Sequence, residues 1–347
     1  MKIVHFVSSL QIGGAERFVI DLCQIQQKEG LKVKILNLGQ SDDPLVSVCQ
    51  AQDIPVETIT KSSRLLKLLK NLFSTDVIHI HSPHVLKSLL LYLFLFFYKR
   101  IIYTRHGERL TNPNWKTIHR LANWTIDHVT FVSTAGLEKF KSGGYLKHTA
   151  HHVIENGVDT DIKINNYIRL PEKVRFASVG RMATLKNQIS LLKALQHINS
   201  SLKSHIEVHF FGDGECEPFL RKYTNENLDI EQVIFHGVET DRNKIYESFD
   251  VLIVTSETEG LSLAIIEAMN FNHPVIASRV GGNPRLVIHE QTGFLFEYND
   301  VETLVTLMQS FIEKPELIDI FGNQAKKHIV SHFSLQKTHK EYLKLYL

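Results

Sequence analysis

The segment Ser256–Ser278, SETEGLSLAIIEAMNFNHPVIAS, follows a short apolar run, Val251–Val254 (VLIV). An apolar run that ends where a helical pattern begins predicts a buried strand followed by a helix, here starting at about Leu261. The segment carries two carboxylates, Glu259 and Glu267, eight residues apart. Eight positions of an α-helix rise about 12 Å, whereas the carboxylate pairs that cleave glycosidic bonds lie about 5 to 9.5 Å apart. We therefore expect the two glutamates to hold opposite ends of one elongated ligand.

The start of this helix is a candidate anion site. The backbone N–H groups of Gly260, Leu261 and Ser262 have no acceptor within the helix, and such groups bind phosphate well. A phosphate between the two glutamates suits this geometry. The alternative is a capped surface helix whose two glutamates are solvated.

The alternation of apolar runs with helical patterns extends over the whole chain. It is typical of βαβ units and of parallel sheets covered on both faces, so the predicted fold class is α/β. We expect strands near residues 3–7, 33–38, 77–81, 101–104, 129–132 and 152–154, and again near 175–179, 207–211, 233–236, 251–254, 275–277 and 294–296.

A polar segment, Glu155–Pro171 (ENGVDTDIKINNYIRLP), separates the two series of strands. It has no apolar periodicity, which marks a connection between domains. We therefore predict an N-terminal Rossmann-like domain over residues 1–165, a second over 166–330, and a helix over 331–347 that packs back on the first domain. Two doubly wound domains predict a cleft between them, with ligands bound at the carboxyl ends of the strands.

Composition narrows the function classes. The 347 residues carry a formal charge of +2, which does not favour a nucleic-acid-binding protein. The three cysteines, Cys23, Cys49 and Cys216, show no CxxC spacing, so neither a disulfide framework nor a cysteine zinc site is expected, and a reducing cytoplasm fits best. The glycines Gly13 and Gly14 follow the first strand without a G-x-G-x-x-G pattern, which argues against a dehydrogenase.

A pair of cations forms a second candidate site. Gly180 and Arg181 end a predicted strand, and Lys186 follows five residues later, before a helical segment at 188–197. Two cations at one loop can stabilise the negative charge of a departing diphosphate. The alternative is an ordinary pair of surface cations.

The segment that runs from Glu259 to Glu267, followed by PVIAS, resembles the E-x7-E signature of the retaining glycosyltransferases of family 4, which have the two-domain GT-B fold. The resemblance implies that Glu259 binds hydroxyls of the donor sugar and that Glu267 binds the nucleotide ribose. It also implies that Arg181 and Lys186 bind the donor phosphates.

Further positions match the same family in order along the chain. The resemblance implies that Gly13 and Gly14 approach the donor phosphates and that His106 lies beside the donor sugar. It places the remaining donor contacts at Gly180, Gly212, Gly237, Val238, Gly260, Leu261 and Ser262. Arg285 departs from the family pattern, which has a glutamate there, and leaves the identity of the donor sugar open.

The resemblance implies a retaining transferase that moves a hexosyl or N-acetylhexosaminyl group from a nucleoside-diphosphate sugar, such as a UDP-sugar, to a hydroxyl of a glycan or lipid-linked glycan. The expected setting is bacterial surface polysaccharide synthesis: lipopolysaccharide, capsule or exopolysaccharide. Two alternatives remain open: a nucleotide-sugar epimerase of the same fold, and a noncatalytic nucleotide-sugar-binding protein.

Histidines and a basic helix raise two other possibilities. His79 and His81 share one face of a predicted strand and could ligate a metal, although the resemblance implies no metal ion and no cofactor. The segment Thr60–Phe73 predicts a basic amphipathic helix, and Leu89–Tyr98 is apolar but too short to span a bilayer. We expect a cytoplasmic protein without an export signal, in which these two segments either contact an anionic membrane surface or pack within the domain.

Overall fold

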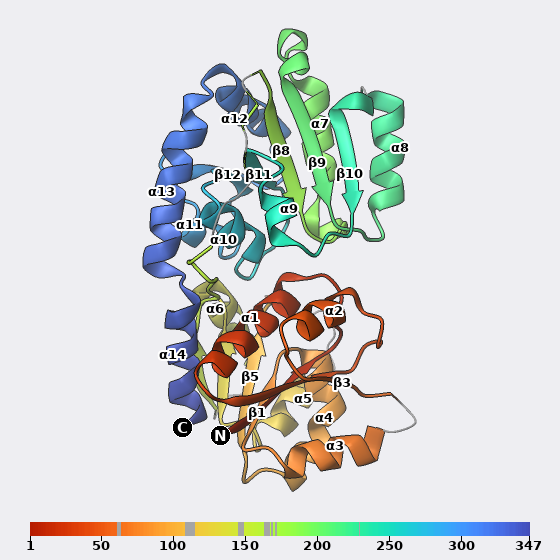
Figure 1. Ribbon diagram of the computed structural model, residues 1–347, viewed down its shortest axis with the longest axis vertical. Coiled ribbons are helices and arrows are strands. Elements are labelled where there is room, and N and C mark those ends of the chain that lie inside the picture. Colours follow the sequence, from red (N-terminus) through yellow and green to blue (C-terminus); the bar gives the residue numbers. More distant parts are fainter. Residues whose placement is uncertain are drawn as a thin grey trace. The chain divides into compact units, whose positions relative to one another are not determined.

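The computed structural model contains two parallel β-sheets with helices (Figure 1). It describes residues 1–60, 64–107, 115–144, 149–162, 167, 169–170, 172–228 and 230–347. The chain divides into unit 1, Met1–Gly157 with Leu335–Leu347, and unit 2, Val158–Ser334. The predicted α/β class, with two doubly wound parallel sheets, is confirmed. The predicted boundary at residues 165 and 166 falls outside the described residues.

The sheet of unit 1 has the strand order β3-β2-β1-β4-β5-β6-β7. Its strands are β1 (Lys2–Val7), β2 (Lys32–Asn37), β3 (Val56–Thr58), β4 (Val77–Ile80), β5 (Arg100–Arg105), β6 (His128–Phe131) and β7 (Ala150–Val153). Its helices are α1 (Gly14–Lys28), α2 (Pro44–Ala51), α3 (Arg64–Phe73), α4 (Pro83–Leu95), α5 (Trp115–Ala122), α6 (Thr134–Ser142) and α14 (Leu335–Tyr346). The strand order reverses direction between β1 and β4, and such a switch point leaves a crevice at the carboxyl ends of the two strands.

The two faces of this sheet differ in chemistry. Apolar side chains such as Phe6 and Ile80 pack with α3, α4, α5 and α6 on one face. Successive side chains of a strand point to opposite faces, so the neighbours of these residues, such as His5 on β1 and His79 on β4, are buried on the other face. That face lies against α1 and α14, because Gln26 and Tyr346 are hydrogen-bonded to its histidines.

Unit 2 has the strand order β10-β9-β8-β11-β12-β13. Its strands are β8 (Val174–Val179), β9 (Ile206–Phe211), β10 (Val233–Gly237), β11 (Val251–Val254), β12 (Val275–Ser278) and β13 (Gly293–Phe296). Its α-helices are α7 (Ile189–His197), α8 (Glu217–Asn227), α9 (Arg242–Tyr246), α10 (Leu263–Asn270), α11 (Asn283–Leu286), α12 (Val301–Glu313) and α13 (Glu316–His332), and its 3₁₀ helices are η2 (Thr184–Lys186), η3 (Ser200–His205) and η4 (Ile230–Gln232). Here the order reverses between β8 and β11, so this pair marks the crevice of unit 2.

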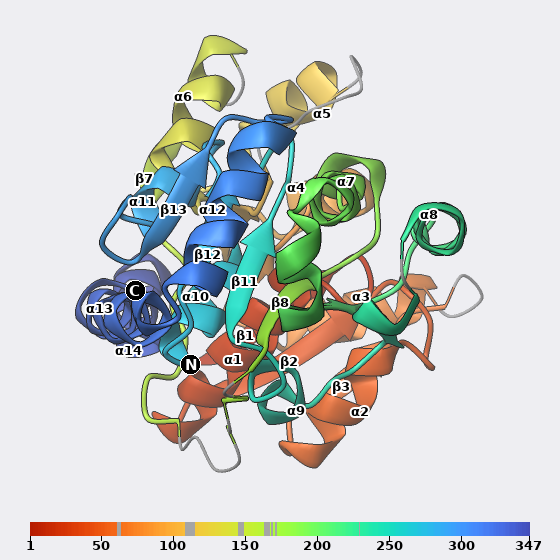
Figure 2. The same cartoon turned by 90° about the horizontal axis from the view of Figure 1, so that it is seen from above.

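Both faces of this second sheet are covered, as the sequence predicts. Val251 and Ile253 of β11 belong to the apolar core formed with α7 and α12, and Leu252, between them, is fully buried on the opposite face. Helix α10 packs against α13, as Figure 2 shows. A largely buried ion pair, Arg175 with Asp250, lies at the start of β8 and β11.

The sequence predictions differ from the structure in a few places. They missed the short strand β3 (Val56–Thr58) and started α10 two residues early, at Leu261. The apolar run Leu89–Tyr98 does not form one helix, since α4 ends at Leu95. Residues 61–63 of the predicted basic helix lie outside the described residues, α3 covers 64–73, and Thr60 is not helical. Within the described ranges, no helix is both long and apolar enough to cross a membrane.

Candidate active site

A pocket opens at the carboxyl ends of β8 and β11, where the strand order of unit 2 reverses. The strands contribute backbone and small side chains, and the loops that follow them contribute the charged and polar groups. The pocket is lined by Ser178, Val179, Lys186, Gln188, Ile253, Val254, Thr255, Ser256, Glu259 and Ser262. The structure thus brings three predicted site residues, Lys186, Glu259 and Ser262, to one pocket.

Lys186 and Glu259 form an ion pair in this pocket. The Lys186 Nζ lies 2.6 Å from Oε1 of Glu259, and the Ser256 hydroxyl donates to the same oxygen at 2.6 Å. The Glu259 residue is 9% exposed, so its charge sits largely out of water. Among the described residues Oε2 has no hydrogen-bond partner, and it can accept a hydrogen bond from a ligand hydroxyl.

Hydrogen bonds between loops hold this pair in place. The Thr255 hydroxyl donates to the backbone carbonyl of Lys186 at 2.9 Å, and the Glu257 N–H donates to the carbonyl of Leu185 at 2.8 Å. The loop after β11 is therefore fixed to η2, the turn that carries Lys186. A cation and an acceptor held in advance of binding lose little entropy when a ligand arrives.

Glycines bring backbone close together along the same edge of the sheet. Gly212, after β9, has φ of +120°, and its N–H donates to the carbonyl of Gly237 at the end of β10. A Cβ on Gly212 would collide with the carbonyl of Gly180, after β8. The predicted residues Gly180, Gly212 and Gly237 therefore lie side by side, and the exposed Val238 follows them.

The N–H groups at the start of α10 are available to a ligand. Gly260, Leu261 and Ser262 are buried, and no described residue accepts a hydrogen bond from their N–H groups. They precede Leu263, the first residue of α10, and together they are a suitable site for an anion. The predicted anion site is thus compatible with the structure, although the helix begins two residues later than expected.

Glu267, on α10, does not line this pocket. Its Oε1 accepts a hydrogen bond from Arg242 Nε at 2.7 Å, and its Oε2 accepts one from the Tyr246 hydroxyl at 2.6 Å. Both partners come from α9. The sequence did not identify Arg242 or Tyr246, because α9 carries no recognisable motif and the contacts span 25 and 21 positions.

Other polar residues of the site were also missed. Gln188 donates from Nε2 to the carbonyl of Arg181, while its buried Oε1 has no partner in the described part of the chain. Such an acceptor is costly unless a ligand donor satisfies it. Ser256, three residues before Glu259, was within the quoted segment and could have been recognised as a donor to that carboxylate. The Arg181 side chain itself is exposed and does not line the pocket.

The remaining predicted site residues belong to unit 1. Gly13 is the residue before α1, and Gly14 is the first residue of that helix; neither has a positive φ, so the backbone does not require glycine there. His106 follows β5, and its Nε2 lies 3.1 Å from His81 Nδ1. Burial lowers the pKa of His106 to about 4, so the imidazole is neutral at pH 7.

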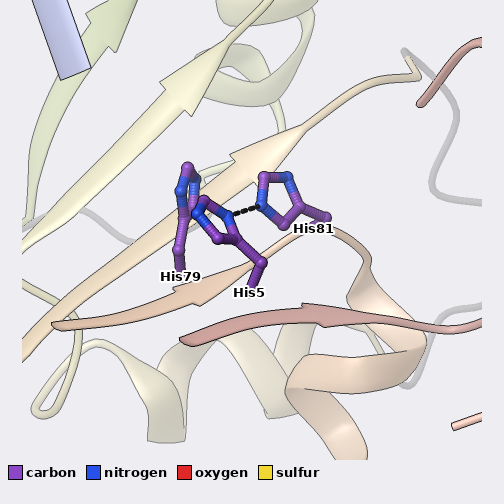
Figure 3. Close-up of side chains that lie close together, drawn as sticks. All are labelled: His5, His79 and His81. Atoms are coloured by element: carbon purple, nitrogen blue, oxygen red, sulfur yellow. Dashed lines mark hydrogen bonds between the residues drawn. The ribbon is translucent and has the colours of Figure 1, made fainter. Parts of the chain in front are cut away.

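The predicted pair His79 and His81 lies beside a third histidine, His5 (Figure 3). One nitrogen from each ring lies within 4.8 Å of the others, a separation that could suit a metal ion. However, both nitrogens of every ring have a hydrogen-bond partner: Gln26 and His81 for His5, Tyr346 and Thr104 for His79, and His5 and His106 for His81. The donor set therefore fits a hydrogen-bonded core better than a metal centre.

Two family models match the chain. Residues 160–328 match the model described as Glycosyl transferases group 1, and residues 12–162 match the model described as Glycosyltransferase Family 4. Together they span residues 12–328, which include every predicted site residue.

Relatives and solved structures agree with these matches. An uncharacterized glycosyltransferase of Haemophilus influenzae is 29% identical over 336 residues, which cover 91% of this chain and 92% of the relative. The UDP-Gal:alpha-D-GlcNAc-diphosphoundecaprenol alpha-1,3-galactosyltransferase of Escherichia coli is 24% identical and covers 100% of this chain and 97% of its own. The crystal structure of Anabaena Alr3699/HepE in complex with UDP and glucose is similar with a TM-score of 0.87, at 20% identity, over 99% of this chain and 98% of that one. The last likeness confirms the expected GT-B type of fold.

Proposed function

Since the chain belongs to the glycosyltransferases of group 1 and family 4, we propose that it is a retaining glycosyltransferase with a nucleoside-diphosphate sugar as donor. The acceptor is a hydroxyl of a glycan or lipid-linked glycan. The observation that supports this most is the Lys186–Glu259 ion pair in the pocket at the switch point of unit 2. It combines a cation for phosphate with an acceptor for sugar hydroxyls.

Each charged group has a distinct part in the proposed reaction. Lys186 and Arg181, with the N–H groups at the start of α10, stabilise the negative charge that develops on the departing diphosphate. Glu259 orients the sugar by accepting hydrogen bonds from its hydroxyls, and Glu267 binds the ribose. Gly13 and Gly14 approach the phosphates, and His106 contacts the sugar.

Retention follows if the acceptor hydroxyl attacks the anomeric carbon from the face that the diphosphate leaves. The bond to the diphosphate breaks as the bond to the acceptor oxygen forms, and the acceptor proton passes to a phosphate oxygen. No side chain then needs to act as a nucleophile. No divalent cation is needed either, because two protein cations and several N–H groups supply the positive charge.

The names of the relatives suggest the substrate class. The Escherichia coli relative is named for a UDP-galactose donor and a lipid diphosphate acceptor, and we extend that class to this chain. We propose a UDP-sugar donor, a hexosyl or N-acetylhexosaminyl group, and an acceptor that is an intermediate of bacterial surface polysaccharide, such as lipopolysaccharide, capsule or exopolysaccharide.

A lipid-linked acceptor requires access to a membrane surface, and unit 1 has a suitable patch. We define the apolar patch as Phe73, Leu91, Leu95, Phe97 and Tyr98, all exposed at the adjoining ends of α3 and α4. The Phe73 and Phe96 rings are 4.9 Å apart, and Lys99 donates to the carbonyl of Phe73, so these ends are in contact. Exposed apolar and basic groups together favour peripheral binding to an anionic leaflet on the cytoplasmic side.

A thermal-shift screen against UDP-, GDP- and ADP-sugars tests the proposed donor site first. A ligand at 100 times its dissociation constant adds about 2.7 kcal/mol of stability. With the donor identified, NMR of the product made on a diphosphate-linked saccharide acceptor gives the anomeric configuration. An inverted product, or an altered sugar nucleotide without transfer, contradicts the proposal. Failure of every nucleotide sugar and nucleoside diphosphate to shift the transition contradicts the proposed donor site, whereas binding of a nucleotide sugar without any transfer favours the noncatalytic alternative.

A further inference from the structure

A chain of buried imidazoles crosses unit 1 at the switch point of its sheet. His5 lies on β1, His81 directly follows β4 and His106 directly follows β5, and these three strands are neighbours. His5 Nε2 lies 2.8 Å from Gln26 Oε1, His5 Nδ1 lies 2.9 Å from His81 Nε2, and His81 Nδ1 lies 3.1 Å from His106 Nε2. Figure 3 shows the His5–His81 hydrogen bond. The chain thus runs from the interior at α1 to the carboxyl edge of the sheet.

All three imidazoles are neutral at pH 7. Burial lowers the pKa of His5 and of His106 to about 4, and it lowers the pKa of His81 well below its ordinary value. A neutral imidazole carries one N–H and one bare nitrogen, so it donates on one side and accepts on the other. A ring that donates at one nitrogen must accept at the other, so the direction of the first hydrogen bond determines the direction of every later bond in this row of imidazoles.

Gln26 determines that direction. Its Nε2 donates to the Tyr346 hydroxyl at 3.2 Å, which leaves Oε1 facing His5. An amide oxygen only accepts, so His5 donates from Nε2 and accepts at Nδ1. His81 then donates from Nε2 to His5 and accepts at Nδ1 from the Nε2–H of His106. The result is a His106 imidazole protonated at Nε2 and bare at Nδ1.

Among the described residues, Nδ1 of His106 is the one ring nitrogen of these three imidazoles that has no hydrogen-bond partner. This nitrogen is buried. An unsatisfied buried acceptor costs about 1 to 3 kcal/mol, and a ligand that supplies a donor removes that cost. The atom lies after β5, at the carboxyl edge beside the switch point, where sheets of this type bind ligands.

We propose that Gln26, His5 and His81 are positioning residues that hold His106 in the Nε2–H tautomer, so that its Nδ1 accepts a hydrogen bond from a hydroxyl of the bound substrate. The identity of this hydroxyl as one of a sugar rests on the proposed function. The tautomer itself does not, because it follows from hydrogen bonds within unit 1 alone.

The tautomer can be measured directly by NMR. Long-range proton–nitrogen spectra of protein labelled with ¹⁵N-histidine distinguish a protonated ring nitrogen from a bare one, and a His106→Gln variant assigns the His106 signals. The expected result for the unsubstituted protein at pH 7 is Nε2 protonated and Nδ1 bare. A protonated Nδ1 overturns the inference, and this measurement needs no substrate.

Substitutions at His81 then test positioning. His81→Asn places an amide oxygen near the original Nδ1 and keeps an acceptor for His106, whereas His81→Leu removes it. We expect His106 in His81→Leu to populate both tautomers and His81→Asn to retain the Nε2–H form. The matched control is His128→Leu, which breaks a 3.1 Å histidine–histidine hydrogen bond to His152 elsewhere in the same sheet. Identical His106 spectra in all four proteins contradict a positioning role.

Transfer kinetics with the donor identified by the screen provide the second readout. His81→Leu is expected to lower kcat/KM about tenfold, the effect of about 1.4 kcal/mol, with His81→Asn closer to the unsubstituted protein and His128→Leu unchanged. Equal loss in His81→Asn and His81→Leu contradicts the inference. If the protein transfers sugar but His106 is protonated at Nδ1, the inference is wrong and the proposed function stands. If Nδ1 is bare but the protein transfers no sugar, the proposed function is wrong and the tautomer inference stands.

Discussion

Lys186 and Glu259, 73 positions apart in the chain, meet with 2.6 Å between Nζ and Oε1. The pair joins the loop after β8 to the loop after β11, and it therefore lies over the switch point of the unit 2 sheet. The Lys186 side chain is 36% exposed while that of Glu259 is 10% exposed, so the cation faces the solvent side of the pair. An incoming anion meets Lys186 already oriented by the carboxylate behind it.

Replacing this lysine separates a role in binding charge from a role in folding. We expect Lys186→Met to lower the rate of sugar transfer about 10²- to 10³-fold, because it removes one preorganised partner of the departing diphosphate. The free energy of unfolding, from urea denaturation, is expected to fall by about 1 to 3 kcal/mol, because the largely buried Glu259 carboxylate loses its cation, and the variant should remain folded. Lys222→Met, which removes an exposed pair with Glu226 on α8, is the matched control and should leave transfer unchanged. Full activity in Lys186→Met would refute the assigned role.

The sequence predicted most of the strands because they are short apolar runs bounded by turn residues. It missed β3, Val56–Thr58 (VET), because three half-buried residues with a central glutamate give no apolar run. It did not locate the end of the helix within Leu89–Tyr98, because a uniformly apolar run contains no signal for a helix end. The same uniformity concealed which residues are buried: Leu93 and Phe96 are buried, whereas Leu91 is 81% exposed.

The site was predictable where its residues belong to one continuous segment. Glu259 and the N–H groups before α10 lie within a single motif, so spacing and residue type were sufficient. The partners of Glu267 were not, because Arg242 and Tyr246 lie on α9, and only the folded sheet brings α9 beside α10. The partner of His106 is as distant in sequence, since His81 follows β4 and lies 25 positions away, and His81 is in turn bonded to His5 on β1.

Two glycines at the carboxyl edge of unit 2 should respond differently to alanine. Gly180 and Gly212 both have positive φ, +137° and +120°, but a Cβ on Gly180 meets nothing within 4 Å, whereas a Cβ on Gly212 meets the Gly180 carbonyl. We expect Gly180→Ala to cost about 1 kcal/mol of unfolding free energy from backbone strain. Gly212→Ala adds a steric clash, so its loss should be larger and should come with weaker binding of the nucleotide. Urea denaturation and calorimetric titration with UDP measure the two effects, and equal losses would contradict this geometry.

The apolar patch of unit 1 predicts a membrane interaction that can be removed without touching the pocket. We expect the unsubstituted protein to float with liposomes rich in anionic lipid at low salt, and to float less as salt rises, because salt screens the attraction of its lysines. Leu91→Glu and Phe97→Glu should reduce flotation, since each puts a negative charge on an exposed apolar position. Ile320→Glu, an equally apolar but unrelated exposed position on α13, should not. Absence of binding to anionic liposomes at low salt would eliminate the proposed contact.

The buried histidines predict a loss of stability in mild acid. Burial lowers the pKa of His5, His106, His119, His209 and His273 to about 4, whereas an unfolded histidine titrates near 6.5. Between these values the unfolded chain binds more protons than the folded one, so stability falls as pH falls from about 6.5 to about 4 and is fully present above 6.5. At pH 5.5 each such histidine lowers the free energy of unfolding by about 1.2 kcal/mol relative to pH 7.

Urea denaturation at pH 7.0 and pH 5.5 measures this difference before most carboxylates titrate. His209→Phe offers the sharper comparison, because His209 packs beside Phe211 and His236 on the unit 2 sheet and a phenyl ring fills a similar space. Removing one titrating group should shrink the difference between the two pH values by about 1.2 kcal/mol, whatever the variant's stability at pH 7. If the difference is the same in both proteins, His209 is not held neutral by burial, because a neutral buried imidazole must contribute to the proton uptake on unfolding.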